Sequence, residues 1–205
     1  MALVERTNAR EQSVETSAGT LTSMLWRRLD VPGHDCATCA VTADGTELGG
    51  MAVFEEDGPT ALHYTVRCDR SWETTEAHVR GWRGARAVDL RLRREGGHWM
   101  LNDAPCPAVD GCVDLDLSFT PATNLFPLRR LDLAIGQAAE LRSAWLEWPA
   151  ARLSPLVQRY ARRSPTEYDY EADLTGTSRF FAVLRVDPRG WVRDYAGLWR
   201  AAAVA

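Results

Sequence analysis

Asp114 and Asp116 are the residues whose types and spacing come closest to a catalytic arrangement. They lie two residues apart in DLDLSF, residues 114–119, where apolar side chains occupy every second position. This alternation predicts a half-buried strand that carries both carboxylates and Ser118 on its other face. Two such carboxylates could act as acid and base on a sugar, or they could form a solvated face or pair with arginine. We favour the second interpretation, because an isolated pair of charges carries little information.

A rigid turn and two arginines follow this strand. Pro121 donates no backbone hydrogen bond, and Asn124 offers side-chain groups that can hold a compact turn. Pro127 restricts the backbone again just before Arg129 and Arg130, which are also nearby partners for the strand carboxylates. Arginine suits bidentate recognition of carboxylate or phosphate. The stretch therefore predicts a shaped binding surface with a polar rim.

Cysteine and histidine give weaker signals. Cys36 and Cys39 have the CxxC spacing of a zinc or redox pair, but no second ligand pair with suitable spacing follows, and whether they form a disulfide stays open. The 4 histidines are dispersed and none lies in an HExxH sequence. Ser118 and Ser154 lack a GxSxG elbow. We therefore expect no metal, no cofactor and no catalytic residue.

Length and composition are those of a globular chain with one sizeable core. The chain has 205 residues, 45% of them hydrophobic. Its formal net charge is -4, and arginine supplies all of its basic side chains because lysine is absent. This modest negative charge does not predict nucleic acid as a partner. No apolar run is long enough to span a bilayer, and the first residues are polar rather than signal-like. The 5 cysteines are an odd number, which favours a reducing compartment. We predict a cytoplasmic protein with a polar tail at residues 1–20 and a single domain at residues 21–205.

Short apolar stretches punctuated by glycine or proline predict a meander of strands. They lie at residues 23–29, 51–54, 61–68, 78–82 and 87–92. Glycines at positions 96 and 97 predict a tight hairpin into residues 99–102, and DPRG at 187–190 predicts another near the end. The best helical signal is SPLVQRY, residues 154–160, where serine can cap and proline can occupy the first turn.

Several motifs together resemble a family of bacterial proteins labelled putative glycolipid-binding, formerly a domain family of unknown function. They are FTPATN with the following proline and RRL, AWL before Pro149, LSPLVQRY, and the ending from Val186 to Trp199; Trp26, Asp69, Trp72 and Trp99 also fit. Trp148 stands where the family usually has phenylalanine, Ala196 where it has proline, and Ser118 where glycine is common. The resemblance spans roughly residues 23–199. It implies a mainly β fold, an antiparallel β-roll or open β-barrel with at most one or two short helices.

The resemblance also implies a glycolipid or similar amphiphile as ligand, bound without catalysis in a cavity of the curved sheet. Three aromatic side chains would contact its acyl or ring portion: Trp99, Phe126 and Trp145. Three polar side chains would bind hydroxyls or an acidic head group: Asn124, Arg129 and Arg130. Two alternatives remain open, a hydrolase or glycosidase that uses the strand carboxylates, and a structural or interaction protein with a filled interior and no small ligand. The oligomeric state is also left open.

Overall fold

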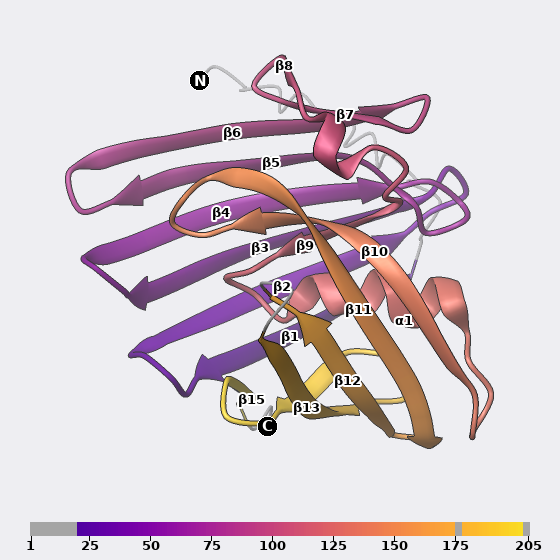
Figure 1. The fold of residues 1–205 in the computed structure, drawn as a ribbon. Helices are drawn as coiled ribbons and strands as arrows, with labels where there is room; N and C mark the ends of the chain where they lie inside the picture. The colour runs from indigo at the N-terminus through magenta and orange to yellow at the C-terminus, as the bar shows by residue number, and fades with distance from the viewer. Residues whose placement is uncertain (1–19, 175–177, 203–205) are drawn as a thin grey trace, which may run out of the picture.

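The chain folds into one continuous, curved and open sheet. In the computed structural model, which describes residues 20–174 and 178–202, this sheet has 15 strands in the order β8-β7-β6-β5-β4-β3-β2-β1-β15-β14-β13-β12-β11-β10-β9 (Figure 1). The first half of the sheet contains β1 (Thr20–Arg28), β2 (Gly33–Val41), β3 (Thr46–Glu55), β4 (Pro59–Cys68), β5 (Thr74–Arg83), β6 (Arg86–Glu95), β7 (His98–Leu101) and β8 (Ala104–Pro105). The second half contains β9 (Asp114–Leu117), β10 (Ala138–Glu147), β11 (Arg152–Ser164), β12 (Glu167–Asp173), β13 (Arg179–Val186), β14 (Val192–Tyr195) and β15 (Trp199–Ala201).

The first half is an antiparallel meander whose strands alternate between a buried and a solvent-facing side. On β4, for example, Leu62, Tyr64 and Val66 are each 0% exposed, whereas the residues between them are partly exposed. The register places Tyr64 opposite Gly50 on β3 and Val79 on β5, so apolar positions on adjacent strands face the same interior. The alternation in the sequence therefore sets which face of this layer is the core.

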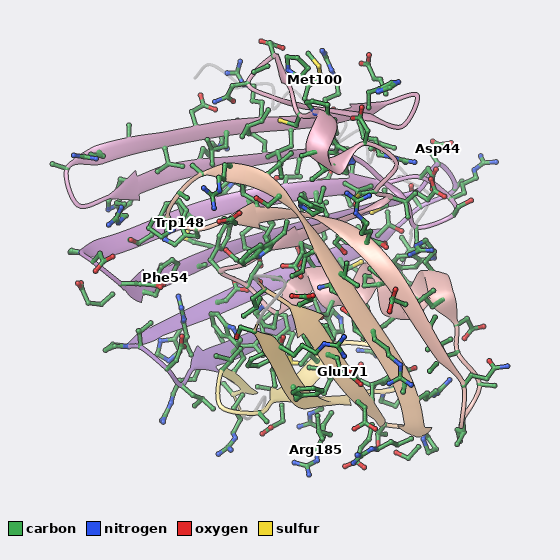
Figure 2. All side chains as sticks on the ribbon, viewed as in Figure 1. Asp44, Phe54, Met100, Trp148, Glu171 and Arg185 are labelled. Atoms are coloured by element: carbon green, nitrogen blue, oxygen red, sulfur yellow. The ribbon has the colours of Figure 1, made fainter. Side chains whose placement is uncertain are left out.

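The second half crosses over the first, and β9 lies between them. In Figure 1, β10 and β11 run obliquely in front of the broad layer made by β2 to β6. β9 pairs in parallel with β10, with Asp116 opposite Trp145. It is joined to β5 through the Leu115 backbone N–H, which donates to the Thr74 hydroxyl at 3.2 Å. Figure 2 shows Phe54 and Trp148 together at one end of this crossing, where their ring centroids lie 6.3 Å apart.

A short helical segment connects β9 to β10. It begins with the 3-10 turn η2 (Ala122–Asn124), continues as α1 (Leu125–Leu131), and is the one α-helix in the described ranges; a second 3-10 turn, η1 (Pro107–Val109), precedes β9. Proline at position 127 fits within the first turn of α1, where its missing N–H has no partner to lose. Leu125, Phe126 and Leu128 point into the core, while Arg129 and Arg130 occupy the last turn.

These observations confirm the predicted mainly β class and the open, curved sheet, which is not closed into a barrel. Two local predictions are wrong. Residues 154–160 belong to β11 rather than to a helix, because every second side chain, at Leu156, Gln158 and Tyr160, is buried on one face of the strand. β12 pairs with β11 only from Val157 onward, so Pro155, which has no N–H to donate, lies outside this pairing. The strand at residues 114–117 is not half-buried as predicted, because the Asp114 side chain on its polar face is only 1% exposed. The predicted tail at residues 1–20 lies, apart from Thr20 in β1, outside the described residues.

Candidate functional site

The FTPATN motif is buried between the two halves of the sheet, and Thr120 joins it to the first half. The Thr120 hydroxyl donates to the Asp35 carboxylate on β2, and the Tyr64 hydroxyl donates to the two oxygens of the same carboxylate at 3.0 and 2.9 Å. Burial raises the pKa of Asp35 to about 6, against the lowering effect of both hydroxyls. A Cβ on Gly50 would lie 2.3 Å from the Tyr64 hydroxyl, so glycine makes room for this contact.

Arg130 is bound by Asp114 on β9. Its Nε donates to Asp114 Oδ1 at 3.1 Å and its Nη2 donates to Oδ2, which makes a two-bond fork. Burial raises the pKa of Asp114, and the Arg130 charge opposes this shift. The structure thus matches the interpretation of the strand acids as partners of arginine for this pair. Because its charge is neutralised by Arg130, Asp114 is poorly suited to act as a general acid or base.

A polar network occupies the inner side of the second half. Gln158 Nε2 donates to Asp116 Oδ2 at 2.7 Å and to the Tyr170 hydroxyl at 2.8 Å. The Tyr160 hydroxyl donates to Asn124 Oδ1 at 2.9 Å, and the rings of Tyr160 and Tyr170 have centroids 5.0 Å apart. We call these five residues the tyrosine network. It anchors the end of FTPATN to β11 and β12 through directional hydrogen bonds.

Asp116 differs from Asp114 because no cation among the described residues pairs with it. Burial raises the pKa of Asp116 to about 6, the Gln158 hydrogen bond lowers it, and the Asp114 charge raises it. A carboxyl group of this kind can exchange a proton near neutral pH. One such group beside a neutralised neighbour does not, however, supply the two available carboxyl groups that glycoside hydrolysis uses.

A small pocket opens where α1, β1 and β2 meet the loops that follow β4 and β13. Its volume is about 190 Å³, and it is lined by Thr20, Thr22, Cys39, Val41, Trp72, Leu125, Arg129 and Arg189. A hollow of about 370 Å³ lies across β4 to β7 and another of about 540 Å³ beside β12 and β13. In those two, charged side chains are already paired, as in Arg67 with Glu76 and Arg163 with Asp169.

Cationic and aromatic groups meet in the small pocket, which we call the Trp72 pocket. The Arg129 guanidinium carbon lies 5.4 Å from the centroid of the Trp72 ring, a cation–π distance. Neither Arg129 nor Arg189 forms a salt bridge with any residue that the structure describes. Both guanidinium groups therefore keep donors available for a ligand, next to an aromatic plane and the apolar side chain of Leu125.

The loop between β4 and β5 holds Trp72 in a fixed position. Asp69 Oδ1 accepts the backbone N–H groups of Ser71 at 2.8 Å and Glu73 at 3.1 Å, and the Asp69 N–H donates to the Glu73 carbonyl at 2.9 Å. Trp72 has φ of 66°, a left-handed conformation that is strained for a bulky side chain. The hydrogen-bonded loop imposes this conformation and presents the indole to the pocket.

The loop between β13 and β14 repeats this pattern on the other side of α1. Asp187 Oδ1 accepts the backbone N–H groups of Arg189 and Trp191, both at 2.9 Å, and the Asp187 N–H donates to the Trp191 carbonyl at 2.9 Å. Gly190 takes the left-handed position with φ of 92°. A Cβ there would lie 3.1 Å from Leu125 Cδ1, so the loop packs closely on α1. Two loops of the same design therefore frame the Trp72 pocket.

The six predicted binding residues are placed in different environments. Arg129 lines the Trp72 pocket, Arg130 binds Asp114, and Asn124 belongs to the tyrosine network. Trp99 and Phe126 are both 0% exposed in the core, where the Trp99 indole N–H donates to the Cys112 carbonyl at 2.9 Å. Trp145 is partly buried on β10, opposite Ser154. Of the six, Arg129 alone lines this pocket.

Sequence reasoning gave no binding role to Trp72 or Arg189, although both lie in motifs that carried the family resemblance. The available signal was the shared loop pattern, an aspartate followed three residues later by a residue that adopts positive φ. The CxxC motif lies on β2, where its odd spacing places exposed Cys36 and buried Cys39 on opposite faces of the sheet. These two cysteines therefore do not form a chelating pair.

Comparisons with known proteins identify the family of this chain. The family model described as "Putative glycolipid-binding" matches residues 23–201. The chain belongs to this family. It is also similar to a DUF1089 family protein from Pseudomonas aeruginosa whose crystal structure is known, with 36% identity, a TM-score of 0.70, and coverage of 81% of this chain and 91% of that chain. No curated protein matches the chain. Within residues 20–174 and 178–202, no helix has the length and apolar character needed to cross a membrane.

Proposed function

We propose that this family member binds an amphiphile with a sugar-containing, acidic head group, and that the head group occupies the Trp72 pocket. The face of Trp72 would stack on a sugar ring, since an indole combines a broad apolar surface with one polar edge. Arg129 and Arg189 would donate charge-assisted hydrogen bonds to hydroxyl and acidic oxygens. Leu125 and Val41 would contact the first carbons of the apolar chain.

The observation that carries this proposal is the meeting of an aromatic plane with two unpaired guanidinium groups on rigid supports. Because hydrogen bonds already hold both loops in place, binding a ligand between them costs little conformational entropy of the loops. The volume of about 190 Å³ suits a head group rather than a complete lipid. The apolar chain would therefore remain largely outside this pocket.

The other sequence-predicted residues take supporting roles in this proposal. Arg130 holds α1 against β9 through its ion pair with Asp114. Phe126 packs in the core and anchors the same helix, and Asn124 fixes the start of the helix by accepting a hydrogen bond from Tyr160. They would affect binding by positioning Arg129. Trp99 and Trp145 would contribute to the stability of the layers on which the helix rests.

Isothermal titration with three soluble amphiphiles tests the proposal: octyl glucuronide, octyl glucoside and octanoate, all below their micelle concentrations. Octyl glucuronide should bind most tightly, because it alone combines a sugar ring with a carboxylate. The double variant Arg129→Ala with Arg189→Ala should weaken it by roughly ten- to a hundredfold, as expected for lost hydrogen bonds to charged groups. Trp72→Asn should weaken both glycosides, since asparagine tolerates positive φ but removes the stacking surface.

Two controls make the result specific to this pocket. Arg185→Ala removes an exposed arginine that is paired with Glu167 on β13, and Phe181→Ser removes an exposed aromatic side chain from the same strand. Both should bind octyl glucuronide like the wild type. Equal affinity for all three amphiphiles, or equal losses in the control variants, would contradict the proposal.

The hydrolase alternative is supported by one observation, the cation-free Asp116 with its raised pKa. Mass spectrometry of the octyl glycosides after incubation separates the two functions. A binding protein returns both glycosides intact, whereas a glycosidase releases octanol, and Asp116→Asn would abolish that release. Product formation that depends on Asp116 would replace the binding proposal with the enzymatic one.

A further inference from the structure

The outer face of the first half carries a group of exposed apolar side chains that strand register brings together. Leu25 lies opposite Cys36, which lies opposite Met51, and one row further Val53 lies opposite Ala61, which lies opposite Trp82; together these define the outer apolar patch. Leu25 is 40% exposed, Met51 and Val53 are both 51% exposed, and Trp82 is 55% exposed. The patch thus extends across β1 to β5.

This patch differs from the exposed apolar residues elsewhere on the sheet. Phe181 on β13 is 64% exposed, but its neighbours across β12 and β11 are Glu171 and Arg159, which form an ion pair at 3.0 Å. A single exposed aromatic residue on a charged face needs no special explanation. A contiguous group on adjacent strands marks an interaction surface.

The rim of the patch is positively charged. Arg27 lies two residues beyond Leu25 on β1, and Arg80 lies two residues before Trp82 on β5, so both are on the same face. Both are exposed, and neither forms a salt bridge with a described residue. Two acids on this side of the sheet have other partners: Asp89 on β6, opposite Arg80, contacts His78 at 2.7 Å, and Glu55 accepts the Gly58 N–H at 3.1 Å.

We propose that the outer apolar patch docks the protein on an anionic lipid surface. An indole at a membrane interface places its apolar ring among the lipid chains and its N–H among the head groups, which suits Trp82. Met51, Val53 and Leu25 add apolar area, and Arg27 and Arg80 meet the lipid phosphates. A second copy bound through the same patch would bring the two positive rims together, so charge favours the lipid surface over self-association.

This inference is independent of the ligand proposed above. The Trp72 pocket is lined by Thr22 and Cys39, whose side chains lie on the inner face, whereas Leu25 and Cys36 lie on the outer face. A lipid surface on the patch would therefore leave the pocket open. Failure of one proposal would leave the other standing.

Vesicle co-flotation of the full chain tests the docking surface, with phosphatidylcholine vesicles that contain or lack phosphatidylglycerol. The wild type should float with the anionic vesicles, weakly or not at all with neutral ones, and less at high salt. Met51→Ser with Trp82→Ser should reduce partitioning roughly tenfold or more through lost apolar burial. Arg27→Gln and Arg80→Gln should each reduce it about fivefold.

Two control variants, checked for folding by circular dichroism, make these results decisive. Phe181→Ser and Arg185→Gln alter the other half of the sheet, and both should float like the wild type. Quenching of Trp82 fluorescence by brominated lipid, lost in Trp82→Phe, should report insertion directly. The absence of flotation, equal losses in the control variants, or a dimer in sedimentation that Met51→Ser with Trp82→Ser converts to monomer would overturn the proposal.

Discussion

The two halves of the sheet differ in the chemistry that they bury. The inner face of β1 to β8 is mostly apolar, and its buried carboxyl group, Asp35, is held by two hydroxyls. The inner face of the second half holds an ion pair, Asp114 with Arg130, and a carboxyl group bound by an amide, Asp116 with Gln158. Apolar packing tolerates changes that conserve volume, whereas a polar network depends on each partner. The first half therefore provides a scaffold, and the second half fixes the position of α1.

The largest expected effect comes from breaking the ion pair of the second half. Arg130→Ala leaves the Asp114 carboxylate buried without its cation, and we expect a loss of about 3–5 kcal/mol in the free energy of unfolding, measured by urea denaturation. Arg185→Ala, at an exposed pair with Glu167, should cost at most about 1 kcal/mol. Equal losses would show that the second half gains no special stability from this pair.

The buried carboxyl groups predict a fall in stability as the pH rises. Burial raises the pKa of Asp35 from its ordinary value of 3.8 to about 6, so the native state binds the proton more tightly than the unfolded state. The stabilising contribution of this proton is complete below about pH 3.8 and disappears as the pH rises through about 6. It amounts to roughly 2–3 kcal/mol.

Unfolding free energies measured between these pH values, for the wild type and Asp35→Asn, test this dependence. The wild type should lose its advantage over the variant as the pH rises. Asp116→Asn should show the same sign and a similar amplitude, because burial raises the pKa of both carboxyl groups to about 6. A pH-independent difference in both variants would mean that neither pKa is raised.

Single hydroxyl groups allow a finer comparison of the halves. Tyr64→Phe removes a donor from the Asp35 carboxylate and should cost about 1.5–3 kcal/mol, because that bond involves a charged acceptor. Tyr170→Phe removes one of the two acceptors of Gln158 and should cost about 0.5–1.5 kcal/mol. Thermal and urea unfolding of both variants give the two costs. The reverse order would mean that the tyrosine network, rather than Asp35, carries the stronger hydrogen bond.

The last prediction compares the reactivity of two thiols on opposite faces of β2, and it involves the smallest change in stability. Cys36 is exposed, whereas burial raises the pKa of Cys39 to about 11 from 9.0, so Cys39 should react with a disulfide reagent at least roughly a hundredfold more slowly. Stopped-flow labelling of Cys36→Ser and Cys39→Ser assigns each rate, and the urea-unfolded chain provides the reference. Similar rates in the folded protein would contradict the placement of Cys39 on the inner face.

The sequence alone predicted the meander because strand alternation is a local property. Residues 61–68 and 87–92 were placed correctly, since each strand of the first half buries one face only. The prediction was wrong at residues 154–160, where serine and proline imitate the start of a helix and the competing signal is pairing with strands far away in the chain. Tertiary pairing overrides such local preferences.

The sequence by itself determined which residues form the motifs, and these motifs were enough to identify the family. The pairing of Arg130 with Asp114 was within reach, because the two lie close in the chain. That Arg129 lies against Trp72 rather than against an acid was decided by the tertiary structure, as was the place of Arg189 beside both. These contacts join α1 to two loops that each lie more than fifty residues from it in the chain, and they exist because the two halves of the sheet cross and bury α1 between them. A one-dimensional pattern records which side chains can bind, whereas the crossing of the layers decides which of them meet.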